Sequence, residues 1–116
     1  MAYETPTCPV EAVVDVIGGR WKTGILYNLL LRPHRFSALR RAMGPITEKM
    51  LIQQLRELEA QGVVQREVFH EVPPRVEYSL TAYGRTLGPT LEALRDWGEQ
   101  HLRRAGERSG APPEKA

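Results

Sequence analysis

The chain has 116 residues, of which 41% are hydrophobic and 26% charged, and its formal net charge is +2. This length suits one domain with a single modest core. No apolar run approaches the ~18–20 residues of a membrane span, and the first residues, MAYETPTCPV, do not form a signal peptide, so we expect a cytoplasmic protein. The single cysteine, Cys8, excludes an internal disulfide and a cysteine-rich zinc site.

Basic residues are concentrated in the middle of the chain. Residues 20–66 carry nine Lys and Arg against three acids, whereas residues 1–19 carry three acids and no Lys or Arg. Residues 67–116 are nearly balanced, with seven basic and eight acidic residues. This distribution is what a local phosphate-binding surface would give, although a solvated arginine-rich surface would give it too.

Apolar residues at helical spacing predict two helices in the first third of the chain. Pro9 suits the first turn of the first helix, Cys8 precedes it at the cap position, and the glycines at 18–19 end it. The second helix covers about residues 21–31 and ends before a proline. We expect residues 1–7 to be flexible.

The next segment predicts a pair of helices joined by a tight turn. After a short extended piece at residues 35–36, Ser37 can cap a brief helix that turns Leu39 and Met43 inward. A break at residues 44–46 separates this helix from the next.

The second helix of the pair has marked ends. Thr47 is a good N-cap, and Gly62 supplies a left-handed exit, so the helix covers residues 47–61. Its buried stripe consists of Leu51, Leu55 and Leu58. Two helices with a glycine-containing turn have the arrangement of a helix-turn-helix.

A hairpin is predicted after Gly62. The segment VVQREVFHEV is rich in β-branched residues, and VEYSL alternates apolar and polar residues. Pro73-Pro74-Arg75 lies between them and cannot be central strand, because proline lacks the ladder donor. We therefore expect a wing with a stiff basic tip at residues 72–76, and an α+β fold that is mainly α.

A last helix is predicted from the cap Thr81 to about Arg104, with Pro89 causing a kink or a delayed start. Its apolar stripe is longer than a core of this size can bury. We therefore expect two copies of the chain to pair through this helix, with the first helix as a further candidate for the same contact. Residues 105–116 are predicted to be a disordered tail. The predicted dimerisation residues are Val10, Val14, Leu87, Leu91, Leu94 and Trp97.

The outer face of helix 47–61 carries an assortment that suits a DNA groove: Thr47, Glu48, Lys49, Ile52, Gln53 and Arg56. Glutamine can pair bidentately with adenine, lysine and arginine can reach guanine or phosphate, and isoleucine can meet a thymine methyl group. The alternative is an exposed polar helix with one stray isoleucine.

Three further arginines are candidate DNA contacts. Arg40 and Arg41 on the preceding helix could clamp the phosphate backbone, and Arg75 in the wing could enter a minor groove or touch phosphate. Alternatively, Arg40 and Arg41 are solvated arginines without a partner role, and Arg75 is a charge that keeps the exposed hairpin from pairing with another chain.

Three segments together resemble one protein family. CPVEAVVDVIGGRWKTGILYNLL, RFSALRRAMGPITEKMLIQQLRELEAQGVV and EVPPRVEYSLTAYGRTL closely resemble the HxlR-type family of bacterial winged helix-turn-helix transcriptional regulators. The resemblance covers about residues 8–97. It implies a domain at 8–104 with added N- and C-terminal dimerisation helices.

The resemblance also implies a function. It implies a homodimer that reads a pseudo-palindromic operator in double-stranded DNA, with helix 47–61 as the recognition helix, and that represses transcription more often than it activates it.

An oxidant or a small molecule is a possible effector. Some members of the family sense oxidants through a cysteine near the N-terminus, and Cys8 matches that position. A thiol at a helix start has its thiolate favoured by the helix dipole. Alternatively, Cys8 serves as a small apolar residue that fills the dimer contact.

An enzyme is not expected. His34, His70 and His101 are far apart, and there is no Gly-rich phosphate loop, so we expect no cofactor and no metal site. The competing interpretation is a winged helix that binds a protein instead of an operator. Such a module need not keep Lys49, Arg56 and Arg75 on one surface.

Overall fold

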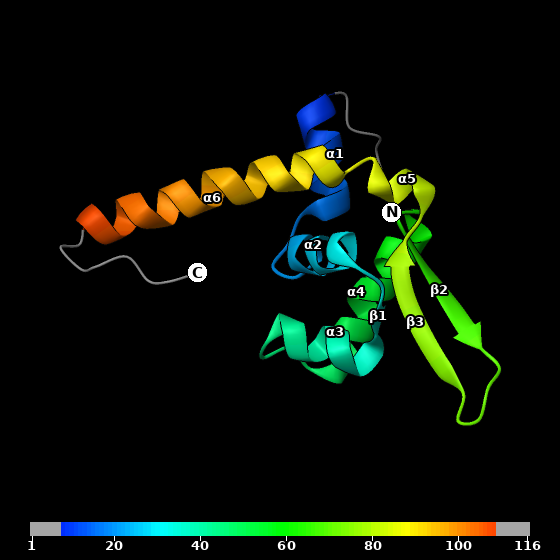
Figure 1. Cartoon of the computed structure of the whole chain (residues 1–116). Helices are drawn as coiled ribbons and strands as arrows, with labels where there is room; N and C mark the ends of the chain where they lie inside the picture. The colour runs from blue at the N-terminus through cyan, green and yellow to red at the C-terminus, as the bar shows by residue number, and fades with distance from the viewer. Residues whose placement is uncertain (1–7, 109–116) are drawn as a thin grey trace.

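The computed structural model describes residues 8–108, so the predicted flexible N-terminus at 1–7 and the tail residues 109–116 lie outside the described residues. The described chain forms six helices and three short strands (Figure 1). In chain order these are α1 (Pro9–Ile17), α2 (Lys22–Leu31), β1 (His34–Arg35), α3 (Phe36–Met43), α4 (Glu48–Ala60), β2 (Val64–Phe69), β3 (Arg75–Leu80), α5 (Ala82–Arg85) and α6 (Gly88–Arg108). The predicted mainly α architecture with a hairpin is confirmed.

The three strands form one antiparallel sheet in the order β1-β3-β2. The hairpin pairs Val64 with Leu80 at its base and Phe69 with Arg75 at its far end. The extended piece expected at residues 35–36 lies one residue earlier, because Phe36 already begins α3. Ser37 is therefore not the cap of this helix; Arg35 holds that position, without a side-chain capping bond.

Helix α4 begins and ends as the sequence predicts. The Thr47 hydroxyl oxygen accepts a hydrogen bond from the Met50 N–H at 3.1 Å, which satisfies one of the free donors of the first turn. Gly62 has a φ of +78°, and the Val63 N–H donates to the Leu58 carbonyl at 3.2 Å. Together with the bond from Gly62 to Glu59, this is a Schellman ending.

The core lies between the helices and the sheet. Leucines 51, 55 and 58 of α4 are at most 1% exposed and belong to one apolar cluster with α2, α3 and β3. Its main members from those elements are Ile25, Leu26, Leu29, Leu39, Tyr78 and Leu80. The cluster fixes the rotation of α4 about its axis, and therefore fixes which residues face outward.

The predicted last helix is divided into two. The Thr81 hydroxyl accepts from the Gly84 N–H at 2.9 Å and so caps the short helix α5. Pro89 is the second residue of α6, where a missing N–H costs nothing, which explains the delayed start. Helix α6 reaches Arg108, four residues beyond the predicted end, and extends past the rest of the molecule (Figure 1).

The apolar stripe of α6 is only partly exposed. Leu91 is 3% exposed and lies in the core of its own chain. The prediction that Leu91 faces a partner chain is therefore wrong. Leu87 is half-buried and packs against the same core.

No helix within residues 8–108 is both long and apolar enough to cross a membrane.

Gly84 permits a close approach that any side chain would prevent. A Cβ atom at this position would lie 2.0 Å from the Val63 carbonyl oxygen. We predict that Gly84→Ala lowers the free energy of unfolding by about 1–3 kcal/mol or more, because backbone must move to relieve the overlap. The exposed neighbour Ala82 offers a matched control, since Ala82→Ser should change stability by less than about 0.5 kcal/mol. Equal unfolding midpoints in urea for Gly84→Ala and the wild type would contradict this packing.

Candidate nucleic-acid interface

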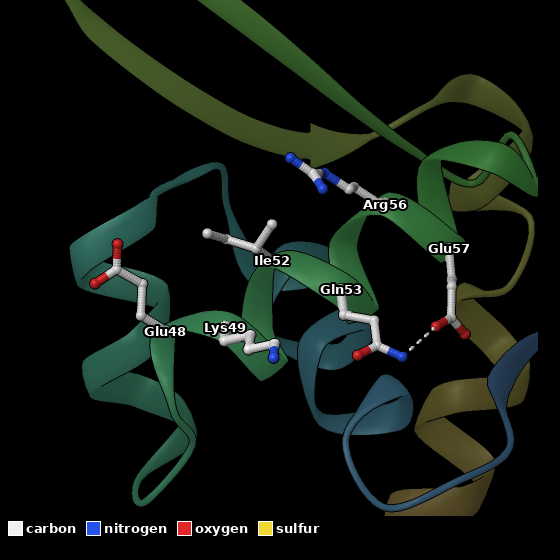
Figure 2. Close-up of a pocket in the computed structure, with 6 residues that line it drawn as sticks. All are labelled: Glu48, Lys49, Ile52, Gln53, Arg56 and Glu57. Carbon is white, nitrogen blue, oxygen red and sulfur yellow. Dashed lines mark hydrogen bonds between the residues drawn. The ribbon is translucent and has the colours of Figure 1, made fainter.

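The outward face of α4 brings the predicted base-reading residues together. Lys49, Gln53 and Arg56 are exposed, and Ile52 is half-buried between them. With Glu48 and Glu57 they line one open hollow along the helix (Figure 2). Thr47 lies exposed at the start of the helix, and its hydroxyl keeps its proton free to donate while the oxygen caps the helix.

Two cations on this face are not neutralised by the protein. Within the described part of the chain, neither Lys49 nor Arg56 lies within ion-pair distance of a carboxylate. Their charges are therefore available to an external anion. The arrangement suits a polyanion, because phosphate contacts depend on unpaired lysine and arginine.

A second hollow adjoins the first at the helix-turn-helix turn. It is lined by Phe36, Ser37, Arg40, Arg41, Gly44 and Glu48. Arg40 is partly engaged, because its Nε donates to the Ile46 carbonyl at 3.2 Å and its guanidinium lies 3.9 Å from Glu48. Arg41 is exposed and has no such ion pair among residues 8–108, so its guanidinium is freer than that of Arg40 to meet an external anion.

Ser37 was missed as a site residue, since the sequence suggested only a capping role. The structure places it exposed in the first turn of α3, on the hollow that Arg41 also lines. A serine hydroxyl there can donate to a phosphate oxygen. The usable signal was its position one helical turn before Arg40 and Arg41.

Arg75 does not occupy the wing tip as predicted. It is the first residue of β3, and its side chain is 25% exposed. Its Nε donates to Glu71 at 2.7 Å, a second guanidinium nitrogen contacts Glu77, and the group lies 3.8 Å from the centre of the Phe69 ring. Two carboxylates therefore offset its charge, and the tip itself consists of residues 70–74, among which Val72 is fully exposed.

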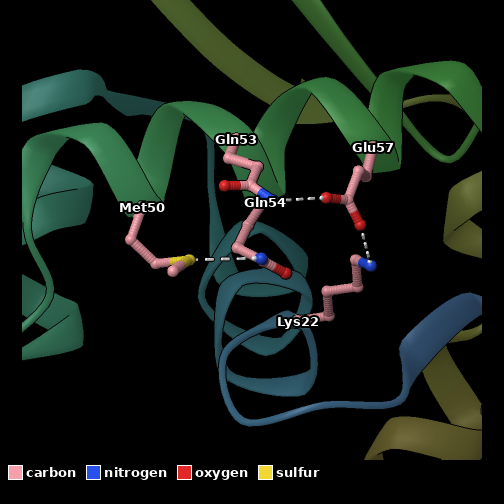
Figure 3. A network of polar contacts seen from close by, with 5 residues as sticks. All are labelled: Lys22, Met50, Gln53, Gln54 and Glu57. Atoms are coloured by element: carbon pink, nitrogen blue, oxygen red, sulfur yellow. Dashed lines mark hydrogen bonds and ion pairs between the residues drawn. The ribbon is translucent and has the colours of Figure 1, made fainter.

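A chain of polar contacts that joins α2 to α4 was also missed. Lys22 of α2 donates through Nζ to Glu57 Oε1 at 2.6 Å, and Gln53 Nε2 donates to Glu57 Oε2 at 3.3 Å (Figure 3). The hydrogen bond from Lys22, and after it the one from Gln53, lowers the pKa of Glu57 below its ordinary value of 4.5. Sequence spacing could have suggested the Gln53–Glu57 pair, which is four residues apart, but not the contact with Lys22.

The terminal helices carry the remaining predicted residues. Cys8 is exposed at the N-cap of α1, without a capping bond from its side chain. The exposed large apolar side chains of α1 and α6 form what is here called the terminal apolar surface: Val10, Val14, Leu94, Trp97 and Leu102. Leu102 was not predicted, because the stripe was followed only to Trp97.

The fold and this face define a winged helix-turn-helix protein. The chain belongs to the HxlR-like helix-turn-helix family, whose model matches residues 16–106. It is 53% identical to the HTH-type transcriptional regulator YybR of Bacillus subtilis (strain 168) over 94 residues, which cover 81% of this chain and 75% of YybR.

Solved structures agree with this assignment. The redox regulator HypR in its reduced form is 50% identical, with a TM-score of 0.79 over 88% of this chain and 99% of HypR. Its oxidised form is 54% identical, with a TM-score of 0.76 over 80% of this chain and 96% of that one. Diamide-treated YodB from B. subtilis is 34% identical, with a TM-score of 0.68 over 81% of this chain and 94% of YodB.

The Lys22–Glu57 pair should contribute pH-dependent stability. Because the folded-state pKa of Glu57 is lowered, the contribution is present above the ordinary value of 4.5 and is lost as the pH falls through the folded value. We predict that Glu57→Gln lowers the free energy of unfolding by about 0.5–1 kcal/mol at neutral pH, as for other pairs that solvent reaches. Urea unfolding at neutral and acidic pH measures this.

Glu59→Gln is the matched control, because it removes the same charge from the same last turn of α4, and no ion pair of Glu59 occurs among the described residues. It should cause no loss, since a carboxylate faces the negative end of the helix dipole there. A stability difference for Glu57→Gln that stayed constant with pH would contradict the pairing.

Proposed function

We propose that this chain is a sequence-specific DNA-binding transcriptional regulator whose helix α4 enters the major groove. The observation that carries the proposal is the outward face of α4, where Lys49 and Arg56 lie beside Gln53 and Ile52 and form no ion pair with any residue of 8–108. A buried leucine stripe on the opposite side holds this face outward. YybR is an HTH-type transcriptional regulator and HypR is a redox regulator, which supports the same function.

Each contact type has a distinct task in this proposal. Gln53 reads a base edge, Ile52 meets a thymine methyl group, and Arg56 reaches guanine or phosphate. Lys49, Thr47 and Arg41 bind the phosphate backbone and set the register of the helix in the groove. Glu48 can accept a hydrogen bond from a cytosine amino group.

The wing takes a different role from the one that the sequence suggested. Arg75 stiffens the hairpin through Glu71, Glu77 and the Phe69 ring, and only the exposed part of its guanidinium can reach a phosphate. The tip at residues 70–74 approaches the backbone or the minor groove. A rigid hairpin loses little conformational freedom on binding, which favours affinity.

We propose that the regulator acts as a homodimer joined through the terminal apolar surface. Trp97 is 67% exposed and Leu102 69% exposed, and a partner helix would remove both from water. A twofold dimer presents two copies of α4 to half-sites about one helical turn apart, or a multiple of this distance. Bound to a promoter in the cytoplasm, such a dimer represses transcription by occluding it.

The experiment that tests the function is selection of random duplex DNA by the purified chain, followed by affinity measurements at two salt concentrations. We predict a pseudo-palindromic site. Gln53→Ala should lose about 1–3 kcal/mol of discrimination at one base pair of each half-site. Arg41→Ala should instead weaken binding to all sequences and lower the salt slope by about one for each phosphate that it no longer binds.

Two results would count against this proposal. One is the selection of no sequence at all, which would favour the protein-binding use of the fold. The other is an unchanged base preference after Gln53→Ala.

The dimer has its own test. Trp97→Asp places a carboxylate on the terminal apolar surface and should shift the molecular mass measured by light scattering from two chains to one, because burying an unpaired charge is costly. Arg103→Asp places the same group on α6 outside the apolar stripe and should leave the dimer intact. A wild-type chain that is monomeric at micromolar concentration would refute the dimer.

We further propose that Cys8 makes the regulator responsive to oxidants. It is an exposed thiol, and the similar structures include the redox regulator HypR and diamide-treated YodB, a transcriptional regulator. Diamide would take up two electrons and two protons from a pair of thiols, either the two Cys8 groups of a dimer or Cys8 and a small thiol, and an S–S bond would form in place of the two S–H bonds. Cys8→Ser should therefore abolish release from the operator by diamide, followed in a gel-shift titration. Release that persists in Cys8→Ser would remove Cys8 from the response.

A further inference from the structure

Glu57 is an acidic residue on a face that we assign to DNA. It lines the same hollow as Lys49 and Arg56, and its side chain is 45% exposed. A carboxylate there repels phosphate, and its place in the last turn of α4 opposes the helix dipole. Neither DNA affinity nor helix stability therefore explains an acid at this position.

The ion pair with Lys22 explains why position 57 holds an acid. It is the first residue of α2, where a cation also opposes the dipole, and its side chain is only 15% exposed. Its Nζ lies 2.6 Å from Glu57 Oε1. This short bond holds the carboxylate toward α2 and leaves Oε2 directed at Gln53 (Figure 3).

The carboxylate dictates which end of the Gln53 amide faces it. An ionised carboxylate only accepts hydrogen bonds, so Gln53 must present its amino group, as the 3.3 Å contact of Nε2 with Glu57 shows. The amide oxygen is then turned away from Glu57. What remains free is one acceptor and one N–H, and this pair of groups matches N6 and N7 of adenine in the major groove.

We propose that Glu57, held by Lys22, is a positioning residue that fixes the amide of Gln53 for the recognition of adenine. The inference rests on the proposed function, in which Gln53 reads a base. Without Glu57 the amide can turn over, and Gln53 then presents its donor and acceptor in either order. The base preference at that position falls, although Gln53 is still present.

A purely structural role for the same residues makes a different prediction. Lys22 and Glu57 also join α2 to α4, and loss of that link alone would weaken binding to every sequence equally. The readout that separates the two roles is the ratio of affinities for the operator and for duplexes substituted at single base pairs.

The experiment uses full-length Gln53→Ala, Glu57→Ala and the double variant on the selected operator and its single-pair substitutions. Gln53→Ala first identifies the base pair that Gln53 reads. Glu57→Ala should reduce discrimination at that pair by about 3–10-fold, as expected for partial loss of a bidentate contact, and leave other pairs unchanged. The double variant should lose no more there than Gln53→Ala alone, because the two residues act as one unit.

Matched variants keep the test decisive. Lys22→Met should reduce discrimination at the same pair, and so should Glu57→Gln, which keeps the size of the side chain but can donate as well as accept. Glu59→Ala, which removes an acid from the same turn, should leave the ratio unchanged. Circular dichroism melting confirms that each variant is folded, and Glu57→Gln replaces Glu57→Ala if the latter unfolds.

The outcomes separate this inference from the function on which it rests. Equal losses on all sequences, or full discrimination in folded Glu57→Ala and Glu57→Gln, would overturn the positioning role and leave the operator-binding function intact. A Gln53-dependent pair that prefers a base other than adenine would overturn the adenine assignment. A wild-type chain that selects no site would overturn both.

Discussion

The burial of one face of α4 is the constraint on which the rest of this structure depends. Leu51, Leu55 and Leu58 are almost fully buried, and each contributes roughly 1.5–3 kcal/mol through removal from water. Rotation of α4 about its axis would expose them, so the opposite face is fixed outward. The N-cap at Thr47 and the left-handed Gly62 set where that face begins and ends. A fixed outward surface of α4 thus follows from packing on the other side of the helix.

Electrostatics divides the basic residues of the middle segment into two groups. Lys22, and to a smaller degree Arg40, are engaged by partners within the chain, as is Arg75 in the wing. Lys49 and Arg56 on α4 are left unpaired within residues 8–108. The number of lysines and arginines in the sequence therefore overstates the positive charge that DNA would meet. The paired cations join elements of the scaffold, whereas Lys49 and Arg56 remain available to an external anion.

The sequence was informative where local chemistry decides the structure. The cap at Thr47, the exit at Gly62 and the leucine spacing of α4 were all read correctly, because each depends on residues within one or two turns. Pro89 indicated a kink or a delayed start of the last helix, and α6 has the delayed start. The sequence failed where contacts join distant segments: the burial of Leu91 against the core, and the bond from Lys22 to Glu57.

In the wing too, contacts that depend on pairing between strands could not be predicted from the local sequence. Pro73 and Pro74 correctly located the turn of the hairpin, but composition could not show that Arg75 starts β3 opposite Phe69. That register places two carboxylates and a ring around its guanidinium. The prediction of a basic tip did not include these partners of Arg75, because their position depends on how β2 and β3 pair.

The most direct test of the central claim is to map where α4 lies on DNA. An iron chelate that cleaves DNA would be attached at position 52 in a Cys8→Ser, Ile52→Cys chain, with Cys8→Ser, Gln100→Cys on α6 as the control. The account predicts cleavage from the major groove within both half-sites, with the two centres about one helical turn apart or a multiple of it, and little cleavage there from position 100. Strong cleavage from position 100 with none from position 52 would show that another surface meets the DNA.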